Sequence, residues 1–145
     1  MADEGDPADL RSEVAAFYSG FGQPELLLAA FRRAALYVPL TEDDRVSTCA
    51  VGGVRWLCAF TDVAELAGWL SQRGVHPDGE YRYHTLLGWR LADYAGAQSD
   101  PTGVLVDAAG AAPIAFPPAV DEDGVAVGMG TAAAGPAGED AAGAV

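Results

Sequence analysis

Two adjacent glycines, Gly52 and Gly53, separate two apolar segments at residues 46–51 and 54–60, and this feature constrains the fold most. A glycine pair between two β-prone segments is typical of a tight hairpin, because the turn needs positive φ at its centre. The sequence therefore predicts two adjacent antiparallel strands in the middle of the chain.

If the two glycines form the whole loop, the numbers of paired residues sum to 105, so Cys49 faces Trp56 and Ser47 faces Cys58. The two cysteines are then diagonal neighbours, whose Cα atoms lie roughly 7–8 Å apart. This spacing is longer than usual disulfide geometry, so we expect reduced, buried, structural cysteines. Alternate positions should form the core-facing side of the hairpin: Cys49, Val51, Val54, Trp56, Cys58 and Phe60.

Hydrophobic spacing along the rest of the chain alternates between the helical and the strand period. Asp62 and Glu65 also have the spacing of a capping box at the start of a helix. The pattern predicts helices at 8–20, 24–34, 62–73 and 85–95, and strands at 35–40, 46–51, 54–60, 80–84, 103–107 and 114–116. We expect an α+β fold, with an antiparallel or mixed sheet of about five strands and helices packed mainly on one face.

The formal net charge is −13, from 21 acidic and eight basic residues, and every basic residue is arginine. This charge opposes binding to nucleic acid or to an anionic membrane. Without lysine, the chain has neither a Schiff-base lysine nor a P-loop lysine. No apolar stretch is long enough to cross a bilayer, so we expect no membrane insertion and a cytoplasmic location.

The composition changes near residue 117. Residues 117–145 contain nine alanines, six glycines, three prolines, five acids and no aromatic residue. Such a segment has too little apolar surface to offset the entropy of ordering it. We therefore expect a single domain at 1–116 and an acidic, disordered tail at 117–145.

Residues suited to catalysis are few. The chain has two histidines and two cysteines, with no metal-binding spacing, no nucleophile motif and no phosphate-binding glycine loop. The sequence therefore predicts no catalytic residue, no metal and no cofactor, and it argues against an enzyme without excluding one.

Aromatic residues are the better candidates for function. Tyr81 and Tyr83 share one face of a predicted strand, and Trp89 and Arg90 follow closely. Exposed tyrosine, tryptophan and arginine side chains are typical of binding hot spots in protein interfaces. We expect these four residues to contact a protein partner, and the competing interpretation is that the aromatic residues belong to the ordinary core of an α+β domain.

The middle of the chain also resembles a known family. Three segments carry the resemblance: a Val-Pro strand at 36–40, a strand ending in Phe-Thr-Asp at 55–62, and a helix reaching Trp69. Together with the strand at 103–107, they resemble the SseB protein N-terminal domain family over residues 24–116, as a single-domain bacterial form. Asp107 and Ala108 stand where that family often has Asn-Pro. Many members also carry a second, C-terminal domain, where we expect only the low-complexity segment at 117–145 here. The resemblance implies a fold and a non-catalytic accessory role.

Three functions remain open. The first is a non-catalytic protein-interaction or adaptor domain. The second is a secretion-associated accessory or chaperone protein, whose acidic surface matches a basic client chain. The third is a small enzyme or ligand-binding protein with a pocket near Tyr37, Asp62 and His84.

Overall fold

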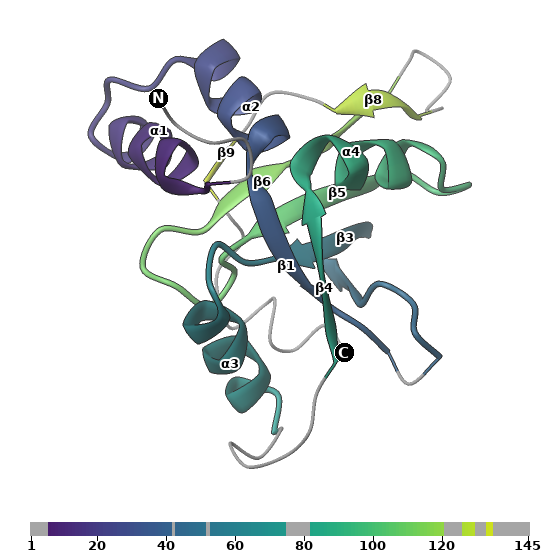
Figure 1. The fold of residues 1–145 in the computed structure, drawn as a ribbon. Helices are drawn as coiled ribbons and strands as arrows, with labels where there is room; N and C mark the ends of the chain where they lie inside the picture. The colour runs from purple at the N-terminus through teal and green to yellow at the C-terminus, as the bar shows by residue number, and fades with distance from the viewer. Residues whose placement is uncertain are drawn as a thin grey trace.

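The structure is a computed structural model, and it describes residues 6–41, 43–51, 53–74, 82–120, 126–129 and 133–134. It has the α+β fold that the sequence predicts (Figure 1). The elements in chain order are α1 (Ala8–Tyr18), α2 (Pro24–Arg33), β1 (Ala35–Pro39), β2 (Thr48–Val51), β3 (Val54–Ala59), α3 (Val63–Gln72), β4 (Tyr83–Leu87), α4 (Gly88–Gly96), β5 (Thr102–Val106), β6 (Ile114–Phe116), β7 (Pro118–Val120), β8 (Ala126–Met129) and β9 (Ala133–Ala134).

The main sheet has the strand order β2-β3-β5-β6-β9. β3 and β5 run parallel, and the other neighbours run antiparallel, so the sheet is mixed. The hairpin register is confirmed, because Cys49 pairs with Trp56 and the paired numbers sum to 105. Both strands are shorter than predicted, since β2 begins at Thr48 and β3 ends at Ala59.

A second ribbon crosses this sheet. β1 and β4 pair antiparallel, and they lie side by side across β3 in Figure 1. The backbones of Tyr37 and Phe60 exchange two hydrogen bonds of 2.9 Å. These bonds fix the ribbon at the end of β3, directly before the chain enters α3.

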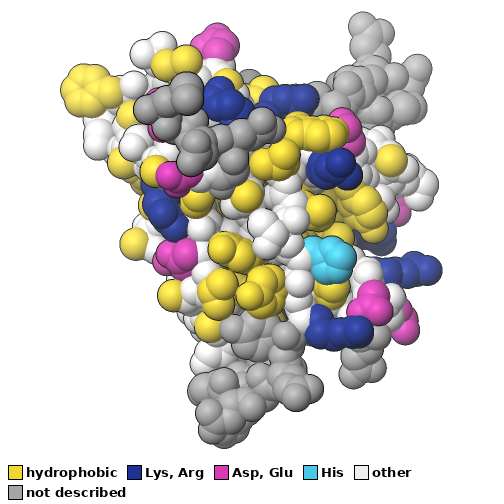
Figure 2. All heavy atoms as spheres, viewed as in Figure 1, with side chains coloured by type: hydrophobic (Ala, Val, Ile, Leu, Met, Phe, Trp, Pro, Cys, Tyr) yellow, Lys and Arg dark blue, Asp and Glu magenta, His cyan; other side chains and the backbone are white. Residues whose placement is uncertain are grey.

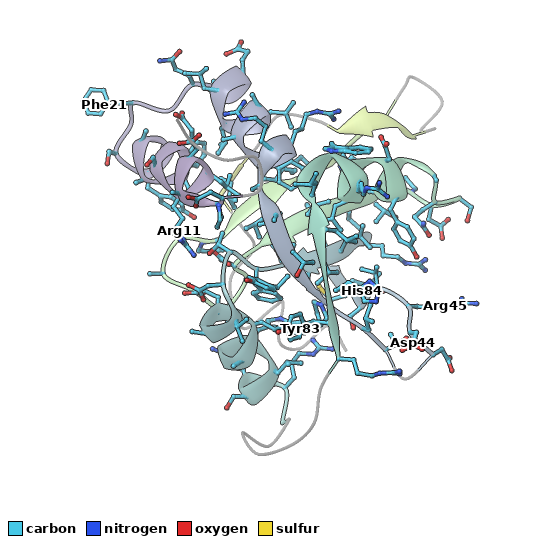
Figure 3. All side chains as sticks on the ribbon, in the orientation of Figure 1. Arg11, Phe21, Asp44, Arg45, Tyr83 and His84 are labelled. Atoms are coloured by element: carbon cyan, nitrogen blue, oxygen red, sulfur yellow. The ribbon has the colours of Figure 1, made fainter. Side chains whose placement is uncertain are left out.

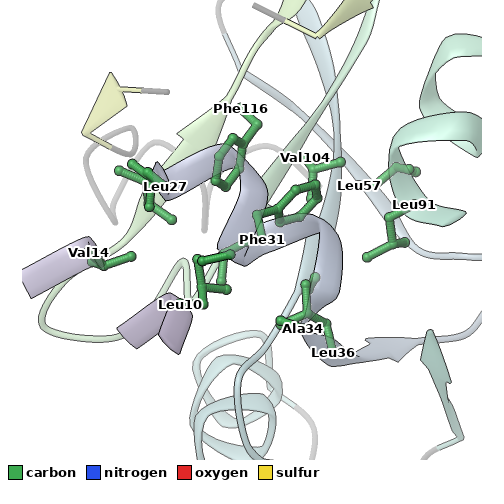
Figure 4. Close-up of a cluster of buried hydrophobic side chains, with 14 of the residues drawn as sticks. Leu10, Val14, Leu27, Phe31, Ala34, Leu36, Leu57, Leu91, Val104 and Phe116 are labelled. Atoms are coloured by element: carbon green, nitrogen blue, oxygen red, sulfur yellow. The ribbon is translucent and has the colours of Figure 1, made fainter. Parts of the chain in front are cut away.

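Both faces of the main sheet are buried. One face carries Leu57 and Val104 and packs against α1, α2 and α4, with Phe31 stacked on Phe116 at a ring distance of 4.3 Å (Figure 4). The other face carries Trp56 and packs against α3. On the hairpin face predicted to be the core side, Cys49, Trp56, Cys58 and Phe60 are buried. The reverse face is divided, because Leu57 and Ala59 are buried whereas Thr48, Ala50 and Arg55 are exposed. Three helices cover one face and one covers the other, which agrees with helices mainly on one side.

The boundary between β4 and α4 differs from the prediction. The sequence predicted a strand at 80–84 and a helix at 85–95, whereas β4 extends to Leu87 and α4 begins at Gly88. Pairing with β1 explains the difference, because Leu87 lies opposite Ala35 and the Gly88 amide donates to Ala34 at 2.9 Å. Backbone pairing with a distant segment here overrides the local helical pattern.

The described residues after 117 also differ from the predicted disorder. β9 pairs with β6, and β7 pairs with β8. Backbone hydrogen bonds to an open strand need no large side chain, so alanine and glycine can make them. Composition alone therefore missed these three short strands.

Among the described residues, no helix has both the length and the apolar character needed to span a membrane.

Gly88 provides a test of the packing between α2 and α4. A Cβ there would overlap the Phe31 carbonyl oxygen and lie 2.7 Å from the Phe31 carbonyl carbon. We expect Gly88→Ala to lower the free energy of unfolding by about 2–3 kcal/mol, because backbone cannot move aside cheaply. Urea denaturation measures this change.

Gly68→Ala is the matched control, because a Cβ at this helical position of α3 meets nothing within 4 Å. It should raise the free energy of unfolding by up to about 1 kcal/mol. Equal effects of the two substitutions would contradict the described packing of α4 on α2.

Candidate ligand-binding cleft

Polar side chains gather where β3 and β5 end. Because these two strands run parallel, the chain leaves both at the same edge of the sheet. Thr61 and Asp62 follow β3, and Asp107 follows β5. Crevices at the carboxyl ends of parallel strands are a common place for binding sites in α/β sheets.

Asp107 is held firmly at this edge. Its backbone amide donates to Ala59 at 2.9 Å, and its φ of 55° is a left-handed value that aspartate tolerates. The Thr61 amide donates to Asp107 Oδ1 at 2.9 Å, and the Thr61 hydroxyl donates to Oδ2 at 2.8 Å. Both carboxylate oxygens are thereby fixed by a single threonine from the neighbouring strand end.

Asp62 joins the start of α3 to α1. Its Oδ1 accepts a 2.7 Å hydrogen bond from the Glu65 amide, which is the N-cap that the capping-box spacing predicts. Its Oδ2 lies 3.2 Å from Arg11 Nη2. The same guanidinium donates to the Thr61 carbonyl at 3.0 Å, as Arg11 reaches from α1 towards α3 (Figure 3).

A cleft of about 240 Å³ lies between these groups. Its lining includes three carboxylates, from Asp62, Glu65 and Asp107, and one guanidinium, from Arg11. Gly110 completes the wall, and a Cβ at this position would overlap the Glu65 carboxylate. The cleft therefore holds more negative than positive charge. A side chain at position 110 would displace the Glu65 carboxylate from its present place in the wall.

The ionisation of the cleft reflects this imbalance. Burial raises the pKa of Asp107, and although the two hydrogen bonds from Thr61 oppose the shift, the pKa stays above its ordinary value. The pKa of Glu65 is also raised, first by burial and then by Asp107 and Asp62, while Arg11 acts in the opposite direction. Both carboxylates would be stabilised by a further cation in the cleft.

Of the residues predicted for a pocket, only Asp62 lines this cleft. Tyr37 is half-buried and packs edge-on against Tyr83, with ring centres 5.5 Å apart. His84 is exposed on β4, opposite Val38 (Figure 3). Tyr37 and His84 do not line the cleft, so the structure does not unite the three residues there.

The predicted aromatic interface is also divided. Tyr83 is 40% exposed at the beginning of β4, whereas Trp89 lies in α4 beyond the other end of that strand. Arg90 is exposed and places its guanidinium 5.0 Å from the Trp89 ring centre. A strand rises about 3.3 Å per residue, so Tyr83 and Trp89 are too far apart to form one compact cluster. Tyr81 lies outside the described residues.

Sequence reasoning missed Arg11, Glu65 and Asp107 as partners in one site. The sequence assigns Glu65 only to a capping box, and it places Asp107 at the end of a strand, where the resembled family often has Asn-Pro. The available signal was the pair of apolar strands that each end in Asp, at Asp62 and Asp107. It could be used only if the strands were known to be parallel neighbours.

Within the described residues, no group of three histidine, cysteine or acidic side chains is arranged to hold a metal ion.

Comparison of the chain with protein-family models gives no match, and neither curated proteins nor solved structures provide one. The resemblance to the SseB N-terminal domain family therefore stays a prediction.

Glu65→Gln tests the charge balance of the cleft. Folding raises the pKa of Glu65, so the ionised carboxylate lowers the stability of the folded state at any pH above its folded-state pKa. This loss of stability disappears as the pH falls from the folded-state pKa towards the ordinary value of 4.5. We expect Glu65→Gln to stabilise the fold at pH 7 by less than about 1 kcal/mol, since solvent screens this partly exposed group. Urea denaturation at several pH values measures the difference.

Glu25→Gln is the control, because Glu25 lies in the first turn of α2, where negative charge favours the helix. It should give no stabilisation at pH 7. A Glu65→Gln variant that is less stable than the parent at pH 7 and equal to it near pH 4.5 would contradict an excess of negative charge in the cleft.

Proposed function

We propose that this chain is a non-catalytic protein-interaction domain that takes a basic side chain of a partner protein into the cleft at the ends of β3 and β5. The observation that carries the proposal is the charge of that cleft, where three carboxylates face one guanidinium. An arginine or lysine side chain would supply the missing positive charge and form charge-assisted hydrogen bonds.

The size of the cleft favours a side chain over a larger ligand. Pockets for cofactors and drug-sized molecules usually have volumes of about 300–1,000 Å³. The volume here is about 240 Å³, which suits the end of one side chain. This argument favours the interaction domain over the small enzyme, because a substrate with reacting groups needs more enclosed space.

The whole-chain charge of −13 supports the same choice of partner. A net negative field attracts a basic protein and raises its association rate. On the face shown in Figure 2, acidic side chains are scattered among arginine and hydrophobic side chains, without forming one large acidic patch. Recognition by the cleft therefore adds a defined point of contact to a diffuse attraction.

Titration with Nα-acetyl-arginine amide, followed by ¹H–¹⁵N NMR, tests the proposal. We expect the amide resonances of Thr61, Glu65 and Gly110 to shift, because these residues line the cleft. Glu65→Gln should weaken the affinity by about tenfold, as one charged hydrogen-bond acceptor is lost. Nα-acetyl-citrulline amide, which has nearly the same shape and no charge, is the matched control ligand.

Equal shifts with the arginine and citrulline ligands, or shifts confined to residues away from the cleft, would refute recognition of a basic side chain. Capture from a cell lysate then extends the test to whole proteins. Glu65→Arg should abolish capture of the partner by filling the cleft, whereas Glu25→Arg on α2 should preserve it.

A further inference from the structure

The two cysteines meet beneath α3. Cys49 on β2 and Cys58 on β3 are both buried, and their Sγ atoms lie 3.5 Å apart. Neither forms a disulfide in this structure. The diagonal spacing of their backbones suggested two separate structural thiols, but the side chains converge to hydrogen-bonding distance.

The surroundings of this thiol pair contain unused hydrogen-bond donors. Among the buried side-chain atoms that the structure describes, three nitrogens lack an acceptor: Trp56 Nε1, Trp69 Nε1 and Arg73 Nη1. Trp56 pairs directly with Cys49 across the hairpin, and both tryptophans belong to the same buried cluster as the cysteines. The Arg73 guanidinium lies 4.4 Å from the Trp69 ring centre. Buried donors without acceptors are rare and need an explanation.

The two sulfurs are not equivalent. The hydrogen bond between the two thiols lowers the pKa of Cys49, and the charge of Arg73 adds to this effect against the opposing effect of burial. The pKa of Cys58 is raised by the same hydrogen bond and by burial. Cys49 is therefore the sulfur that carries negative charge more readily, and Cys58 is the one that retains its proton.

We propose that Cys49 and Cys58 form an oxidisable thiol pair that hydrogen peroxide converts reversibly into a disulfide. The Cys49 thiolate attacks one peroxide oxygen and breaks the O–O bond. This gives a sulfenic acid at Cys49 and hydroxide, which takes up the proton that Cys49 released. The Cys58 sulfur then attacks the Cys49 sulfur, the S–O bond breaks, and the sulfenic oxygen leaves as water with the Cys58 proton. The two thiols lose two electrons, and one peroxide is reduced to two waters.

The burial of the pair selects the oxidant. Cys49 is 3% exposed and Cys58 is fully buried, so a small peroxide can approach where a protein or peptide disulfide is excluded. Closing the S–S bond also requires the backbones to approach each other, because diagonal Cα atoms are about 7–8 Å apart. Within the described sheet β2 is an edge strand that pairs only with β3, so a small shift of its central residues disturbs no other strand of that sheet. The chain directly before it stays anchored, because the Ser47 amide donates to Pro39 at 2.9 Å.

Treatment of the reduced full-length chain with hydrogen peroxide tests the proposal. We expect intact mass spectrometry to show a loss of about 2 Da, thiol titration after denaturation to fall from two thiols to none, and dithiothreitol to restore both. Peptide mapping should join Cys49 to Cys58 within one chain. Persistence of both thiols, overoxidation to sulfinic acid, or dimers joined through cysteine would overturn the proposal.

Variants then separate the roles of the residues. Cys58→Ala should stop the reaction at a Cys49 sulfenic acid, which dimedone traps when the oxidised chain is unfolded in its presence. Cys49→Ala should leave Cys58 unmodified under the same conditions. Arg73→Gln should slow oxidation several-fold, and Arg73→Lys, which keeps the charge, should preserve most of the rate. Dimedone labelling of Cys58 in place of Cys49 would refute the assignment. Circular dichroism confirms that each variant is folded, and the parent chain alone decides whether the disulfide forms.

Discussion

β3 and β5 run parallel, so the chain must leave both strands at the same edge of the sheet. This constraint brings Thr61 and Asp107 together, although 46 positions separate them in the sequence. The two hydrogen bonds between them continue the contact beyond the last paired residues of the strands. This junction between the ends of β3 and β5 positions the start of α3, the turn at Gly110 and Arg11.

The junction has an electrostatic cost that bears on function. Fixing Asp107 beside Asp62 and Glu65 collects negative charge in a partly buried place, and among the described residues Arg11 is the cation that lines it. The raised pKa values of Asp107 and Glu65 express this excess. A fold of this size needs no such cluster for its core, which is formed by the apolar faces of the sheet. A site with uncompensated charge is a good candidate for binding.

The sequence predicts the local elements better than their meeting points. The hairpin register followed from Gly52 and Gly53 because turn geometry sets the pairing of adjacent strands. The predicted end of the strand at residue 84 was wrong, because β4 continues to Leu87 by pairing with Ala35 of β1, which lies 52 positions away in the sequence. For the same reason the sequence predicts Asp62 as a helix cap. Its proximity to Asp107 can be predicted only once β3 and β5 are known to be parallel neighbours. The short distance between the cysteine sulfurs depends on side-chain orientation, which backbone register alone does not give.

The ionisation of the cleft can be measured directly by ¹³C NMR titration of the side-chain carboxyl groups. In the free protein, the pKa values of Glu65 and Asp107 should lie above their ordinary values of 4.5 and 3.8. Both should fall when Nα-acetyl-arginine amide saturates the cleft, because a bound cation favours the ionised carboxylates. Ordinary or lowered pKa values in the free protein, or values that the ligand leaves unchanged, would contradict a cleft built to receive a basic side chain.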